Sequence, residues 1–269
     1  GKGVVIAQNT QEAIAALTGF KKMGEAASQV IIEEYLDGEE LSFFVVTDGI
    51  QALPLGSAQD HKKVFDGNRG PNTGGMGAFS PSPLVTPALE AQIMDKVIEP
   101  TLQGLSKEGC PYTGVLYAGI MLTQKGLYVL EFNARWGDPE AQALLPRLKT
   151  DWVDVMEATL DGCLDQIHLE WETGSAICVV LASGGYPGDY EKGAYIRGLD
   201  KALPSGVTIF HAGTVLKEGE WFTAGGRVLG VSAKGPNVSQ ARDQAYAAIQ
   251  QISFEKMHYR TDIGGLISS

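Results

Sequence analysis

The sequence predicts an α+β protein in two parts. The larger part has a mainly antiparallel sheet with helices, and a small, mostly antiparallel β unit with one capping helix follows it. Apolar runs flank Asp48-Gly49 and Gln124-Lys125-Gly126, which indicates hairpins and hence antiparallel strands. Helical periodicity lies between these hairpins. After Gly162 the apolar runs become short and are separated by tight turns, and one helical stretch follows them.

Three helices are predicted in the first part. Residues 10–17 form one, with Thr10 as its N-cap. The second begins at Thr86-Pro87, the favoured order for an N-cap and the first helical residue, and Pro100 kinks or ends it. Residues 151–160 form the third.

The predicted strands of the first part are short apolar runs bounded by turn residues. The stretch 59–77 is long, polar and glycine-rich, so it is predicted to be a functional loop. The strands are residues 30–32 (buried), 40–47, 50–55, 113–122 and 127–132.

The second part begins near residues 165–172. A turn-rich linker over 184–188 and a helix over 239–251 are predicted there, and the helix turns Ala241, Ala245, Ala248 and Ile249 inward. The strands predicted for this part are residues 176–182, 207–210, 213–216, 221–223 and 227–232.

The composition limits the classes of function. The chain has 269 residues, 44% of them hydrophobic, which is enough for a well-packed core. A formal net charge of −11 argues against a general nucleic-acid or membrane-surface binder, and no apolar run is long enough to span a bilayer. Cys110, Cys163 and Cys178 fit neither a disulfide framework nor a zinc spacing, so we expect a reducing, cytoplasmic location.

The most informative stretch is Glu131-Phe132-Asn133-Ala134-Arg135-Trp136-Gly137-Asp138-Pro139-Glu140, which follows an apolar strand. Because strand side chains alternate between faces, Glu131 and Asn133 are predicted to point the same way. A carboxylate and an amide oxygen placed like this suit Mg²⁺, which also takes substrate phosphates as ligands. A strand end with solvated polar residues would look the same, and the pair alone does not separate the two interpretations.

A possible nucleoside site precedes it. In residues 30–40 a predicted strand ends in two acids and then a glycine-containing turn. The exposed backbone of such a strand end offers N–H and C=O groups to an adenine edge, and a later carboxylate can accept from ribose hydroxyls. An acidic hairpin rim would have the same composition.

Basic and glycine-rich elements in this acidic chain suggest a phosphate site. Asp60-His61-Lys62-Lys63 and Gly70-Pro71-Asn72-Thr73-Gly74-Gly75-Met76-Gly77 share the long loop, and Gly1-Lys2-Gly3 is a third such element. Glycines let backbone amides approach an anion, and successive N–H groups form nests that bind phosphate. Together with the Glu131 and Asn133 pair, these elements point to a nucleoside triphosphate enzyme. The G-x-x-x-x-G-K-[ST] loop and the kinase motifs are absent from the sequence.

Taken together, these residues resemble the phosphoribosylamine–glycine ligase family (glycinamide ribonucleotide synthetases) of the ATP-grasp superfamily. The unbroken Gly-Pro-Asn-Thr-Gly-Gly-Met-Gly at 70–77 is the most specific piece, and the resemblance covers essentially the whole chain. The other stretches that carry it are residues 1–4, 33–40, 59–63, 131–140, 211–214, 225–229 and 262–264.

The resemblance implies a ligase that uses ATP and Mg²⁺ (or Mn²⁺). Such an enzyme joins glycine to 5-phosphoribosylamine through a glycyl phosphate, early in purine synthesis. It also implies that residues 1–30 are the remainder of the ATP-grasp lid, that 31–168 form the core with the nucleotide and metal site, and that 169–269 form a C-terminal β-rich domain.

Residue roles also follow from the resemblance. Glu131 and Asn133 would hold the metal. Arg135, Asp138 and the Asp60-His61 pair would lie near the amino acid or the ribose phosphate, and Lys63, Asn72, Arg135 and Asp138 would serve catalysis. ATP contacts are implied for Lys2, Glu33, Glu34, Tyr35, Leu36, Glu40, Lys63 and Asn72.

The chain departs from the family pattern in two ways. Family members carry an N-terminal domain, the first part of the lid and an ATP-contacting lysine ahead of Gly-Lys-Gly, so we expect this chain to be the later part of a longer polypeptide, with that domain as its partner. Lys63 stands where the family commonly has Arg. Lysine keeps the positive charge but lacks the bidentate fork of arginine. Two alternatives stay open: another ATP-grasp carboxylate–amine ligase, or an inactive nucleotide-binding module.

Overall fold

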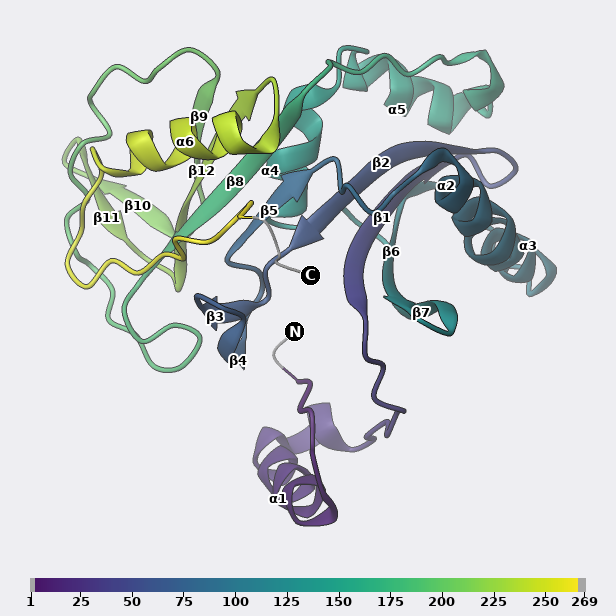
Figure 1. The fold of residues 1–269 in the computed structure, drawn as a ribbon, viewed down its shortest axis with the longest axis horizontal. Helices are drawn as coiled ribbons and strands as arrows, with labels where there is room; N and C mark the ends of the chain where they lie inside the picture. The colour runs from purple at the N-terminus through teal and green to yellow at the C-terminus, as the bar shows by residue number, and fades with distance from the viewer. Residues whose placement is uncertain (1–2, 266–269) are drawn as a thin grey trace.

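The computed structural model describes residues 3–265, apart from the side chains of Met23 and Ala26. An eight-stranded sheet runs through it in the order β7-β6-β1-β2-β5-β8-β12-β9, and each neighbouring pair is antiparallel (Figure 1). The α+β prediction is therefore confirmed. The strands of this sheet are β1 (Glu39–Thr47), β2 (Ala52–Asp60), β5 (Gly77–Ser80), β6 (Gly114–Thr123), β7 (Gly126–Asn133), β8 (Ser175–Ala182), β9 (Val207–His211) and β12 (Arg227–Gly235).

Two small hairpins lie beside the main sheet as separate two-stranded sheets: β3 (Lys63–Phe65) with β4 (Arg69–Asn72), and β10 (Thr214–Lys217) with β11 (Glu220–Thr223). The first hairpin falls within the stretch 59–77, which was expected to be a loop. That expectation is wrong for these residues, because a turn over 66–68 brings Phe65 opposite Arg69.

Helices cover both faces of the sheet. The longer ones begin where the sequence predicts, and Thr86, Asp151 and Asn237 each cap a helix by accepting a hydrogen bond from a backbone N–H. The helices are α1 (Thr10–Phe20), η1 (Lys21–Ala27), α2 (Pro87–Ile93), η2 (Met94–Ile98), α3 (Glu99–Lys107), α4 (Glu140–Leu144), η3 (Leu145–Arg147), α5 (Trp152–Asp161), η4 (Leu164–Gln166) and α6 (Val238–Ile249).

Strand β1 lies at the centre of the first half and is buried on both faces. Leu41 and Phe43 belong to the core formed with α2, η2 and α3. Phe44 and Val46 belong to a second core with residues of α4 and α5. Apolar residues on both faces of one strand are expected where helices cover both sides of a sheet.

Pro100 does not end its helix. The chain continues from α2 through a π-helical turn, η2, into α3, and Pro100 lies in the first turn of α3. Proline lacks an N–H and clashes with the carbonyl four residues earlier. A π-helical turn changes the hydrogen-bonding pattern there, so the helix accommodates the proline without stopping.

Three local predictions are wrong for identifiable reasons. The β1–β2 turn has four residues, 48–51, because Asp48 Oδ1 accepts the N–H groups of Ile50 and Gln51. The N-cap of α1 is Asn9 instead of Thr10. Residues 30–32 are not a buried strand: Ile31 and Ile32 are each 83% exposed, and no described segment pairs with them.

The sheet crosses the boundary expected near residues 165–172. Strand β5 pairs with β8 over Gly77–Ser80, which joins the first part of the chain to the second. Helix α6 then packs on β8, β9 and β12, and Ala241, Ala245, Ala248 and Ile249 are buried as predicted. The division into units at residues 30 and 168 stays a prediction.

Two expectations from composition can be compared with the structure. No helix in the described residues is both long and apolar enough to cross a membrane. Cys110, Cys163 and Cys178 are all free thiols, as expected from their spacing.

The burial pattern predicts a large difference between two isoleucines. Ile120 on β6 is fully buried, so Ile120→Ala is expected to lower the free energy of unfolding by about 2–5 kcal/mol. Ile50→Ala is the matched control, because Ile50 is 87% exposed in a turn and its loss should change stability by less than about 0.5 kcal/mol. Urea unfolding followed by circular dichroism measures both, and equal effects would contradict the assigned packing.

Candidate active site

One face of the sheet becomes polar where β1, β6 and β7 lie side by side. Ser42 of β1 pairs with Gly119 of β6, which pairs in turn with Glu131 of β7. Two residues further along β7, Asn133 lies opposite Tyr117. Directly opposed residues project from the same face of a sheet. Glu131 and Asn133 therefore share one face of β7, as their spacing predicts, and both lie beyond the irregularity in the pairing near Gly119.

Lys62, two residues after β2, brings positive charge to this face. Its Nζ forms an ion pair with Glu40 and lies 3.9 Å from Glu131 Oε1. Burial alone would lower the pKa of Lys62, but the negative charges of Glu40, Asp60 and Glu131 raise it. Lys62 therefore stays a cation at neutral pH.

A buried carboxyl group, that of Glu140, and a half-buried one, that of Asp60, lie nearby. Glu140 Oε1 lies within 3.1 Å of Ser42 Oγ. Asp60 Oδ1 is buried and has no hydrogen-bond partner within residues 3–265. Burial raises the pKa of both carboxyl groups, and the charge of Glu140 raises that of Asp60 further. We call Glu40, Asp60, Glu131 and Glu140, with Lys62 among them, the carboxylate cluster.

Two glycines leave room for these two carboxyl groups. A Cβ at Gly75 would lie 2.8 Å from Asp60 Oδ1 and 2.4 Å from Pro139 Cδ, and Gly75 has φ +111°. A Cβ at Gly137 would lie 2.5 Å from Glu140 Oε2. The glycines at these two positions are therefore required by close contact.

The glycine-rich stretch 70–77 is held in place by the protein itself. The N–H of Gly74 donates to the Tyr186 hydroxyl, and that of Gly75 donates to Thr73 Oγ1. The N–H groups of Thr73 and Met76 donate to backbone carbonyls. Because all four N–H groups are already bonded, the expectation of a phosphate-binding nest is wrong for residues 73–76.

Arg227, at the start of β12, ties this stretch to the loop after β7. Its Nη1 donates to the carbonyl oxygens of Gly74 and Asp138 and lies 3.2 Å from Asp138 Oδ1. Arg135 is exposed and donates to the carbonyl of Trp136. Of these two loop residues, Asp138 is therefore the one in contact with the second part of the chain.

The other predicted ligand residues that the structure describes lie on the β3–β4 hairpin and in the segment before β1. Lys63 and Asn72 pair with each other across the β3–β4 hairpin. Residues 33–36, which hold Glu33, Glu34, Tyr35 and Leu36, precede β1 in a segment without regular secondary structure, and Tyr35 is 63% exposed. Lys2 lies outside the described residues.

The predicted site residues did not include three that the structure brings into this site. Lys62 contacts the cluster directly, whereas the family resemblance implied an ATP contact only for its neighbour Lys63. Glu140 and Arg227 were seen only as parts of matching stretches. The signals were present: Glu140 closes the polar run after β7, and Arg227 is a lone cation between a glycine turn and a strand.

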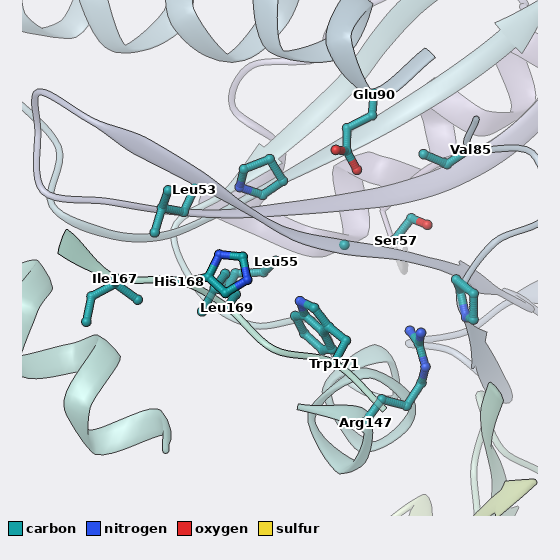
Figure 2. Close-up of a pocket in the computed structure, with 13 residues that line it drawn as sticks. Leu53, Leu55, Ser57, Val85, Glu90, Arg147, Ile167, His168, Leu169 and Trp171 are labelled. Carbon is teal, nitrogen blue, oxygen red and sulfur yellow. The ribbon is translucent and has the colours of Figure 1, made fainter. Parts of the chain in front are cut away.

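A cavity of about 490 Å³ lies elsewhere, between β2, the beginning of α2 and residues 167–171 (Figure 2). Trp171 and Arg147 line it, and the Arg147 guanidinium lies 5.7 Å from the Trp171 ring centre. Arg147 also donates to Ser80 Oγ and to the carbonyl of Gly174. The lining of this cavity includes none of the predicted ligand residues, so we place the candidate active site at the carboxylate cluster.

Two family models match the chain. Residues 1–141 match the phosphoribosylglycinamide synthetase ATP-grasp (A) domain, and residues 176–265 match the phosphoribosylglycinamide synthetase C domain.

Named relatives agree with this match. The chain is 48% identical to phosphoribosylamine–glycine ligase of Brucella melitensis over 98% of its own length, and 49% identical to the chloroplastic one of Arabidopsis thaliana. It spans 62% and 51% of the length of these two proteins.

Solved structures show the same fold. The crystal structure of phosphoribosylamine–glycine ligase from Thermotoga maritima matches with a TM-score of 0.84 and 37% identity, over 98% of this chain and 66% of that one. Biotin carboxylase from Campylobacter jejuni matches with a TM-score of 0.70 and 11% identity, over 98% of this chain and 57% of that one. The predicted ATP-grasp fold is confirmed.

The environment of His61 predicts a pH dependence of stability. Burial, and then the charge of Arg260, lower its pKa from 6.5 to about 4. Between these values the unfolded chain takes up a proton that the folded protein does not. Stability is therefore expected to be complete above pH 6.5 and to fall as the pH drops towards 4, by a total of about 3 kcal/mol.

Urea unfolding of wild type and His61→Gln across this range tests the prediction. The variant should lose markedly less stability than wild type on acidification. His168→Gln, which replaces an exposed histidine, is the matched control and should follow wild type. An equally steep loss in His61→Gln would show that other groups cause the acid sensitivity.

Proposed function

Since this chain belongs to the phosphoribosylglycinamide synthetase family, we propose that it carries the nucleotide and metal site of an ATP-dependent ligase. The reaction would join glycine to 5-phosphoribosylamine and release ADP and phosphate. The supporting observation is that Glu131 and Asn133 share one sheet face, next to the Lys62 cation. Because the chain spans only part of its relatives, we propose that catalysis also needs an N-terminal part of the same polypeptide.

The residues present fit a divalent metal. Glu131 is 46% exposed on its side chain and accessible to a ligand, and Asn133 supplies an amide oxygen on the same face. The described residues hold no group of three or more His, Cys, Asp or Glu side chains suited to a metal. A site with two protein oxygens, completed by phosphate oxygens and water, is typical of Mg²⁺ bound with a nucleotide. When bound, Mg²⁺ (or Mn²⁺) neutralises charge on the phosphates.

The charge balance of the cluster favours cationic ligands. Four carboxyl groups surround one lysine, and the raised pKa of Asp60 and of Glu140 reflects the cost of ionising them without a further cation. A metal ion would supply positive charge at Glu131. We propose that the ammonium group of glycine supplies it at Asp60, whose Oδ1 has no partner in the described chain, with Glu140 alongside. A buried oxygen without a partner is costly, and an ammonium ion would remove that cost.

The chemistry then needs positioning more than a protein nucleophile. A carboxylate oxygen of glycine attacks the terminal phosphorus of ATP, and the bond from that phosphorus to ADP breaks. The amine of 5-phosphoribosylamine attacks the acyl carbon, the bond to phosphate breaks, and the nitrogen gives a proton to solvent. Lys62 and Lys63 would offset phosphate charge, Glu40 would accept from ribose hydroxyls, and the backbone of residues 33–36 would frame adenine.

For the other predicted site residues we propose only the part of the substrate that each one faces. We propose that Asn72 contacts phosphate and that Arg135 and Asp138 lie towards 5-phosphoribosylamine, because both follow the metal pair on one loop. Lys2 would belong to a covering flap. Three free thiols support a cytoplasmic location. If the chain belonged to a different ATP-grasp ligase, ADP would be released with other amino acids. If it were an inactive module, no ADP would be released with glycine and 5-phosphoribosylamine.

Glu131→Gln tests the metal assignment. In the full-length protein it should lower the rate of ADP release by at least about 100-fold, because a neutral amide binds a hard cation weakly. The melting temperature should stay near that of wild type, since Glu131 is half exposed. Glu220→Gln, on β11 away from the cluster, is the matched control and should retain full activity. Near-normal turnover by Glu131→Gln would refute the assignment.

Asp60→Asn tests the ammonium site. The variant should raise KM for glycine by about 10- to 100-fold while KM for ATP changes little, because only the amino acid loses an ionic partner. Asp151→Asn, a helix N-cap in which Asn also serves, is the control for this substitution. A rise confined to KM for ATP would place Asp60 on the nucleotide side instead.

A further inference from the structure

The β3–β4 hairpin depends on contacts outside the main sheet. Within residues 3–265 its two strands pair only with each other, and Lys63 and Asn72 are paired at its base. Thr73 donates to the carbonyl of Lys62, which fastens the base. The far end of the hairpin has no strand neighbour in the described part of the chain, so other contacts must set its direction.

Those contacts come from the C-terminal segment, residues 258–263, almost 200 positions away in sequence. In Figure 1 this yellow segment runs back from α6 towards the middle of the molecule. His258 Nε2 lies 2.8 Å from the carbonyl oxygen of Val64, and the rings of His258 and Phe65 are 5.5 Å apart. At the turn of the hairpin, Thr261 N donates to Asp66 Oδ1.

Arg260 is the centre of this contact. It is 1% exposed, and its Nη1 donates to the carbonyl of Lys63 at 3.0 Å and to Asn68 Oδ1 at 3.0 Å. Its Nε and Nη2 each donate to Asp262 at 2.7 Å. Asp262 Oδ2 also accepts from Gly67 N at 2.8 Å. One guanidinium therefore joins strand β3 and the turn of the hairpin to the C-terminal segment.

The charge of Arg260 is already balanced. Burial would raise the pKa of Asp262, but hydrogen bonds from Arg260 and Gly67 hold it well below its usual value. A buried arginine paired bidentately with a carboxylate is a poor anion ligand and a rigid support. Arg260 is therefore suited to hold other groups in place instead of binding substrate.

We infer that Arg260 is a positioning residue that holds the β3–β4 hairpin, and with it Lys63 and Asn72, against the phosphates of ATP. The inference rests on the proposed function. Its hydrogen bond to the Lys63 carbonyl fixes the peptide unit from which the Lys63 side chain departs. Losing this bond frees the hairpin, and a displacement of about 1 Å at a reacting group can cost about 100-fold in rate.

Arg260→Met in the full-length protein tests the inference by three measurements. The kcat/KM for ATP should fall by about 10- to 100-fold while KM for glycine stays within about twofold. Hydrogen exchange of residues 64–72 should become faster than in wild type. Arg197→Met removes an exposed arginine from the same part of the chain and is the matched control. It should leave kcat/KM for ATP, KM for glycine and the hydrogen exchange of residues 64–72 unchanged.

A double-mutant cycle with Lys63→Ala separates positioning from general stabilisation. Because Arg260 acts in part through Lys63, the loss in kcat/KM for ATP in the double variant should be clearly smaller than the product of the two single losses. Multiplied effects, or a Lys63→Ala enzyme with unchanged use of ATP, would overturn the inference. Should Arg260→Met not fold, Asp66→Ala replaces it, because it removes the acceptor of Thr261 at the hairpin turn, and the same loss in kcat/KM for ATP is expected.

The failures of the two proposals can be told apart. If wild type releases no ADP with glycine and 5-phosphoribosylamine, the proposed function fails. If wild type and Arg260→Met use ATP equally well and exchange hydrogen equally slowly over residues 64–72, the function stands and the role of Arg260 is refuted.

Discussion

The electrostatics of the carboxylate cluster constrain the rest of the site. Asp60, Glu131, Glu140 and Glu40 converge on Lys62, and Glu140 and the Oδ1 atom of Asp60 are buried. Ionising all four carboxyl groups is costly unless a cation is added, because like charges repel and buried charges lose hydration, and the raised pKa of Asp60 and of Glu140 reflects that cost. A side chain at Gly75 or Gly137 would clash with Asp60 or Glu140, so glycine at both positions lets these carboxyl groups lie where they do. A metal ion and an ammonium group are the cations that the proposed reaction would bring.

The two parts of the chain share the work of forming this site. Strand β8 continues the sheet beside β5, and Arg227 of β12 bonds to Gly74 and Asp138 of the first part. The C-terminal segment reaches the β3–β4 hairpin through Arg260. These contacts hold segments of the first part that border the candidate site. We therefore regard the second part of the chain as a structural support of that site.

Local patterns predicted much of the fold and the central pair of the site. Hairpins, helix caps and the inward face of α6 follow from short-range chemistry, and the shared face of Glu131 and Asn133 follows from strand alternation. Contacts between distant residues were not predictable in this way. Lys62 and Lys63 are neighbours in sequence, and only the fold brings Lys62 to Glu131 and links Lys63 to Arg260. Residues 30–32 have the composition of a strand, but a strand needs a partner, and none is described beside them.

The shared sheet face of Glu131 and Asn133 is the feature on which the proposed function depends most. A crystal structure of the full-length protein with Mn²⁺ and ADP, measured at the manganese absorption edge, locates the metal directly. We expect the anomalous peak to lie in direct contact with a Glu131 carboxylate oxygen and the Asn133 amide oxygen. A manganese ion bound to the nucleotide but to neither of these side chains would contradict the assignment and remove the basis for the proposed site.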